Sequence, residues 1–125
     1  MKINIEKVTN GKIYFSTAFG KANGAWKGLN DPVEKEYYVE FDVEGIYCYS
    51  DFIIGVNKEY KIKIIDGEIQ ITLLLLEYDD DGCATFKFGE TIIEIETKYD
   101  ERFLALKDAY VTLFVDNLNI YDENF

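Results

Sequence analysis

Carboxylates are the plentiful acid–base groups of this chain, which has 24 Asp and Glu residues and no His. Glu94 and Glu96 would point to the same face of a strand, about 7 Å apart by the rise of a strand, a separation that suits a carboxylate pair around a glycosidic bond. Any solvent-facing strand with alternating Glu gives the same pattern, so the pair is weak support for catalysis. Nucleophile pairs that depend on an imidazole base are excluded by the composition. We therefore expect no enzyme and no catalytic residues.

A metal or cofactor site is also poorly supported by the motifs. Residues 79–81 are three consecutive Asp followed by Gly82, but an EF-hand loop needs Gly at its sixth position rather than its fourth. A hairpin turn explains the same residues, although the sequence leaves open whether the turn holds an ion. Common zinc sites need imidazole or several thiolates, and no phosphate-binding glycine motif is present. We predict no cofactor and no metal ligand.

The elements that would position these carboxylates are strands. Residues 36–45 alternate apolar and acidic side chains, the period of a half-buried antiparallel strand. Asp-Gly at residues 66–67 is a strong hairpin signal, and further turns are predicted at residues 80–82 and 89–90. Residues 59–98 are therefore predicted to form a four-stranded meander.

Three other segments are less regular. Residues 100–107 predict a short helix. The strand that follows it, residues 109–121, is expected to be interrupted at Asp116-Asn117 by a bulge or a bend. Residues 18–32 contain three Gly and the single Trp26, and we predict a long loop there. Trp26 either plugs one end of the fold or is carried on a recognition loop.

The chain as a whole is predicted to be one all-β domain, residues 1–125, either an antiparallel Greek-key barrel or a two-sheet sandwich, with one short helix before the last strand. The N-terminus has neither a signal peptide nor a membrane segment, so we expect a cytoplasmic protein. Cys48 and Cys83 are then expected to be reduced, although a disulfide between them stays possible.

Charge is distributed unevenly along the sequence. Residues 1–63 carry nine Lys and nine Asp or Glu, whereas residues 64–125 carry four Lys or Arg and fifteen Asp or Glu. Nucleic-acid binding needs Lys and Arg against phosphates, so it is disfavoured, whereas a basic protein partner is favoured. The alternative is that these charges only keep the domain soluble. The candidate partner-binding residues are Asp79, Asp80, Asp81, Glu90, Glu94 and Glu96, with Tyr78 and Tyr99 nearby.

In this general character the chain resembles the immunity proteins of bacterial toxin systems, including contact-dependent inhibition. Its segments DDDGCATFKFGETIIEIE and LKDAYVTLFVDNLNIYD are also similar to the closing strands of small bacterial β-barrel proteins. The resemblance implies a non-enzymatic protein that binds and neutralises a basic toxin domain, and it transfers no site residue. The alternative is a small-molecule or carbohydrate-binding module that uses the Trp26 loop. We expect a monomer or a small homo-oligomer.

Overall fold

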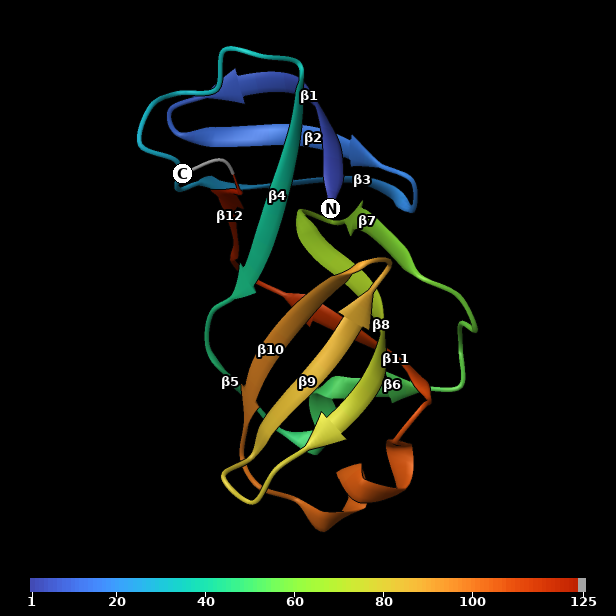
Figure 1. Ribbon diagram of the computed structural model, residues 1–125. Helices are drawn as coiled ribbons and strands as arrows, with labels where there is room; N and C mark the ends of the chain where they lie inside the picture. The colour runs from blue at the N-terminus through green and yellow to red at the C-terminus, as the bar shows by residue number, and fades with distance from the viewer. Residues whose placement is uncertain (124–125) are drawn as a thin grey trace.

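The computed structural model describes residues 1–123 and shows an all-β fold, as predicted (Figure 1). Two short 3-10 helices, η1 and η2, interrupt the strands. The elements in chain order are β1 (Lys2–Thr9), β2 (Lys12–Thr17), β3 (Gly20–Trp26), β4 (Glu36–Val43), β5 (Ile46–Tyr47), η1 (Tyr49–Asp51), β6 (Phe52–Ile54), β7 (Lys61–Ile65), β8 (Glu68–Tyr78), β9 (Cys83–Phe88), β10 (Thr91–Thr97), η2 (Glu101–Leu106), β11 (Tyr110–Val115) and β12 (Leu118–Asp122).

Five of these strands close into a ring, so of the two predicted architectures, barrel and sandwich, the structure has the barrel. The order β12-β4-β1-β2-β3 is closed because β12 pairs with β4 on one side and with β3 on the other. The β12–β4 pairing is antiparallel, with Leu118 opposite Val43, whereas β12 runs parallel to β3, with Ile120 opposite Trp26. Closure leaves the paired strands without a free edge at these positions.

The remaining strands lie outside this ring. The predicted meander is confirmed, because β7, β8, β9 and β10 pair consecutively and antiparallel. Strand β11 pairs with the other edge of β8 and then with β6, while β5 pairs with β10 in parallel. The meander meets the ring where Gly20 of β3 pairs with Ile62 of β7.

Turn chemistry explains the meander hairpins. Asp66 and Gly67 have φ values of 51° and 82°, the left-handed conformation that a tight two-residue hairpin requires at both positions. The β8–β9 turn is closed by hydrogen bonds from Gly82 N to the Asp79 carbonyl and from Asp79 N to the Cys83 carbonyl. Both hairpins predicted from these residues are therefore confirmed.

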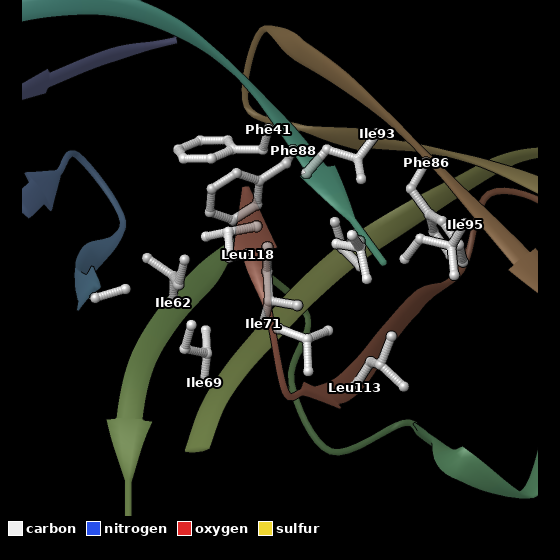
Figure 2. Close-up of a cluster of buried hydrophobic side chains, with 14 of the residues drawn as sticks. Phe41, Ile62, Ile69, Ile71, Phe86, Phe88, Ile93, Ile95, Leu113 and Leu118 are labelled. Atoms are coloured by element: carbon white, nitrogen blue, oxygen red, sulfur yellow. The ribbon is translucent and has the colours of Figure 1, made fainter. Parts of the chain in front are cut away.

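One hydrophobic cluster runs through the ring and the meander (Figure 2). Phe41 of β4 and Phe88 of β9 meet edge to face with ring centroids 6.4 Å apart, a favourable aromatic geometry. Strand β8 contributes Ile71 and Leu73, which are fully buried, so the interpretation of this apolar strand as core is confirmed.

Two predicted irregularities differ in part from the structure. The segment predicted as a long loop, residues 18–32, contains strand β3, and the loop begins only after Trp26. The predicted last strand is two strands, because the chain leaves the meander at the end of β11 and joins the ring as β12. Asp116 and Asn117 form this crossing, and the chain bends at Asp116, so the predicted bend is confirmed and the bulge is not.

The short helix predicted over residues 100–107 is the 3-10 helix η2. Its N-cap, Asp100, accepts a hydrogen bond from Arg102 N at 3.0 Å, and Phe103 and Leu106 are buried. The few apolar positions support only this short element. Within residues 1–123, no helix is long and apolar enough to cross a membrane.

Candidate functional site: an acidic groove between β4 and β10

The outer faces of β4 and β10 border one groove. Because side chains alternate across a strand, β4 buries Val39, Phe41 and Val43 and exposes the acidic residues between them. Strand β10 alternates in the same way, burying Ile93 and Ile95 and exposing Glu94 and Glu96. The two strands are not hydrogen-bonded to each other along this stretch, so their acidic faces form the walls of a groove.

This groove has a volume of about 690 Å³ and is lined by five carboxylates. No salt bridge involves any of the five within residues 1–123. We call it the acidic groove, and its carboxylates are Asp42, Glu44, Asp81, Glu94 and Glu96. Five acidic groups without a protein counter-charge favour binding of a cationic group.

A buried amide orients the β4 wall. The side chain of Asn119, on β12, is 4% exposed and donates to Glu44 Oε1 at 2.6 Å and to Asp42 Oδ2 at 3.4 Å. A hydrogen bond from a neutral amide to a carboxylate is strengthened by the charge of the carboxylate, and it leaves that charge in place. Asn119 therefore fixes these two carboxylates while leaving the groove negative.

The thiol of Cys83 reports the potential in the groove. Its pKa is raised first by burial and then by the charges of Glu94, Asp79, Glu96 and Asp81. Negative neighbours disfavour the thiolate because it would add another negative charge. Cys83 is consequently a poor nucleophile at neutral pH. Both Cys83 and the exposed Cys48 are free thiols.

A chain of hydrogen bonds holds the β8–β9 turn, which carries Asp81, against β10. The Asp100 backbone N–H donates to Tyr78 Oη at 3.1 Å, Tyr78 Oη lies 2.7 Å from Thr97 Oγ1, and Thr97 Oγ1 donates to the Gly82 carbonyl at 2.7 Å. Asp79 completes the turn by accepting from the backbone N–H groups of residues 81 and 83. Asp79 thus shapes the turn.

The sequence-predicted site residues divide between the groove and other places. Asp81, Glu94 and Glu96 line the acidic groove. Asp80 is exposed in the turn. Glu90 lies in the β9–β10 hairpin, at the opposite end of β10 from Glu96, so the structure does not bring it to the groove.

The two tyrosines have different environments. Tyr78 is half-buried, stacks on Phe103 with ring centroids 4.6 Å apart, and lines a separate small pocket. Its role in the structure is to support the turn. Tyr99 is 50% exposed and packs against Tyr78, so it alone of the two offers a largely open ring to a partner.

The sequence reasoning missed the β4 wall. Alternation in the sequence places Asp42 and Glu44 on an exposed strand face, but it does not connect them with residues in the second half of the chain. Asn119 was missed altogether, and only its position in an apolar strand could have marked it as a buried amide. The structure brings acidic residues from both halves together, although the sequence places its excess charge in the second half.

Trp26 lies at the end of strand β3 and not on the predicted loop, so the placement of this residue on a loop is wrong. It ends β3, is 8% exposed, donates from Nε1 to the Asn30 carbonyl at 2.7 Å and meets Tyr37 edge to face. It lines one wall of an open pocket of about 830 Å³, together with the chain that follows it and with residues of β4 and β12. We call this the apolar pocket, and its apolar lining is Trp26, Leu29, Val33, Tyr37 and Tyr121.

The structure shows no metal centre in the described residues, and comparisons with known proteins find no match. Among residues 1–123, no group of three or more His, Cys, Asp or Glu side chains is arranged to hold a metal ion. No family model matches the chain. No curated protein matches it, and no solved structure does either.

Proposed function

We propose that this protein binds a basic protein partner through the acidic groove and acts in the manner of an immunity protein that neutralises a toxin domain. The observation that carries the proposal is the gathering of five carboxylates, from β4 and the residue after it, from β10 and from the β8–β9 turn, none of which forms a salt bridge among residues 1–123. Holding like charges together costs stability. A cationic partner would remove that repulsion and gain charge-assisted hydrogen bonds.

The groove itself is tested with a minimal cationic probe, the peptide octalysine. We expect it to bind, with a dissociation constant that rises steeply as salt is added. The variant Asp81→Asn/Glu94→Gln/Glu96→Gln should bind about tenfold more weakly, since three exposed charge contacts at about 0.5 kcal/mol each give that factor.

The control removes the same charge elsewhere. The variant Asp66→Asn/Glu68→Gln/Glu90→Gln alters three acidic residues outside the groove, and we expect near-normal binding. Equal weakening in the two variants would mean that octalysine responds only to total charge. Such a result would overturn the assignment of the groove as the binding site.

The immunity role needs a separate experiment in cells. Wild-type protein, co-expressed with a basic toxin domain from the neighbouring reading frame, should restore growth, whereas the triple groove variant should not. A neighbouring product that is not basic, or protection that is unchanged by the groove variant, would contradict this role.

A small-molecule or carbohydrate-binding module is the second candidate, and the apolar pocket is the observation in its favour. Pockets of this size with aromatic walls suit small ligands. A sugar would need the open face of an aromatic ring, however, and the Trp26 indole is covered. Quenching of Trp26 fluorescence by acrylamide tests the point, because free access of this neutral quencher would revive the candidate.

A further inference from the structure

The acidic groove does not end at β4 but continues toward the apolar pocket. A shallow hollow of about 510 Å³ joins the two, sharing Asp42 and Glu94 with the acidic groove and Tyr121 with the apolar pocket. The result is one track along the outer face of β4 and its neighbour β12, acidic at one end and apolar at the other. Residues 40–44 alone, which are the end of β4 and the residue after it, cover about 13 Å of this track.

The apolar end presents two large side chains to solvent. Leu29 is 94% exposed and Val33 is 87% exposed, and both lie in the connection from β3 to β4, which loops around the outside of the ring (Figure 1). Contiguous apolar surface rimmed by polar groups marks interaction sites in folded proteins. Here the rim is formed by Lys27, Asn30, Asp31 and Asp122.

This connection is also held in place by specific contacts. Trp26 Nε1 donates to the carbonyl of residue 30, and Tyr37 Oη accepts hydrogen bonds from the backbone N–H groups of Val33 at 2.9 Å and Glu34 at 3.1 Å. Two aromatic residues therefore fix the backbone that carries the two exposed apolar side chains. Preorganisation of this kind lowers the entropy that a partner must remove when it binds.

We propose, on the basis of the function proposed above, that the track binds an extended basic segment of the partner that ends in bulky apolar side chains. The basic side chains would lie over the acidic groove and the apolar end would pack against Leu29, Val33 and Tyr121. Charge complementarity with the acidic groove is the argument for the basic part of this segment. The continuity of the groove with the apolar pocket is the argument for its apolar end. The acidic part would accelerate association and the apolar part would slow dissociation.

Octalysine and two longer peptides test this inference, one extended with Leu-Phe at its N-terminus and one at its C-terminus. None contains Trp, so Trp26 is the only indole in the sample and its fluorescence reports contacts at the apolar pocket. We expect one of the extended peptides to bind about tenfold tighter than octalysine and to change the Trp26 emission. Octalysine alone should leave the emission nearly unchanged.

The variant Leu29→Ser/Val33→Ser should abolish the tenfold gain while leaving octalysine binding and its salt dependence intact. The matched control is Val8→Ser/Val56→Ser, which changes two exposed apolar residues that do not line the track, and it should keep the gain. Because all four side chains are exposed, neither variant should unfold the protein.

Three outcomes would overturn the inference: neither extended peptide binds tighter than octalysine, the gain survives the Leu29→Ser/Val33→Ser change, or light scattering shows a dimer that this change dissolves. The last would assign the apolar pocket to a second copy of the chain. The first two would leave the proposed function standing. Failure of octalysine itself to bind in a salt-dependent way would instead overturn the proposed function.

Discussion

Replacing Tyr78 by Phe should destabilise the protein measurably, because it breaks the hydrogen-bond chain behind the acidic groove. The direction of each proton follows from the partners. Thr97 has one hydroxyl proton and donates it to the Gly82 carbonyl, so Tyr78 must donate to Thr97 Oγ1 while accepting from the Asp100 N–H. Tyr78→Phe leaves the Asp100 N–H without an acceptor and Thr97 Oγ1 without a donor.

The magnitude follows from these two losses. A buried or half-buried polar group that loses its partner costs about 1–3 kcal/mol, and Asp100 N–H lies where water can partly replace Tyr78. We expect about 1.5 kcal/mol for the pair, which lowers Tm by about 6 °C in a chain of this size. The stacking of the ring on Phe103 should be retained, because Phe has the same ring.

Urea denaturation of wild type, Tyr78→Phe and the control Tyr99→Phe measures the effect. Tyr99 is half exposed and its hydroxyl has no hydrogen-bond partner in the described part of the chain, so its replacement should change the free energy of unfolding by less than about 0.5 kcal/mol. The double variant Tyr78→Phe/Thr97→Val should lose less stability than the sum of the losses in the two single variants. Equal stabilities for Tyr78→Phe and Tyr99→Phe would refute the hydrogen-bond chain.

Three further predictions concern other residues. Gly82→Ala should be far more destabilising than Gly67→Ala, as chemical denaturation would show: both glycines have φ near +80°, but only at Gly82 would a Cβ collide with a neighbouring carbonyl. Equal losses of stability in the two variants would show that the strain of Ala at a positive φ determines the effect, and not the collision at residue 82. Iodoacetamide at pH 8 should alkylate exposed Cys48 several-fold faster than Cys83, because the pKa of Cys83 is raised by burial and by the charges of the acidic groove. Mass spectrometry after timed quenching measures the two rates, and faster alkylation of Cys83 would contradict the prediction. The pKa of Asp100 is lowered to about 2 by hydrogen bonds from the arginine two residues later. Its contribution to stability is therefore present above about pH 4 and is lost as pH falls toward 2, and NMR titration showing an ordinary pKa would contradict this.

The meander could be predicted from sequence because its signals are local. Alternation over a few residues and a turn that contains Gly define each hairpin without reference to the rest of the chain. The partners of β11 and β12 could not be predicted in this way, since both strands look alike in sequence and differ only in which distant strand they meet.

Strand β3 was missed because its inward side chains are small. Ala22, Gly24 and Trp26 alternate on the buried face, but only Trp26 is large enough to register as apolar. The reason is a close backbone approach: a Cβ at Gly24 would lie 2.6 Å from the Leu118 carbonyl oxygen. Glycine here marks contact with another strand rather than a loop.

Only the β10 side of the acidic groove could be predicted from the sequence. Glu94 and Glu96 follow from alternation in β10. Asp42 lies on β4 and Glu44 directly follows that strand, about fifty residues earlier, and the closed ring sets the position of β4 opposite β10. Charge counted along the sequence therefore assigned the negative surface to one half of the chain, while packing assembled it from both.

The closed ring also has a consequence for the order of folding. Strands β1 to β4 come early in the chain, yet the ring closes only when β12 inserts between β3 and β4. In the sequence, β12 comes after all the strands of the meander. Such non-local closure makes folding slow, and until it occurs the edges of β3 and β4 stay open to other strands. The last strand thus converts two open edges into a finished barrel, and it brings Asn119 to the groove in the same step.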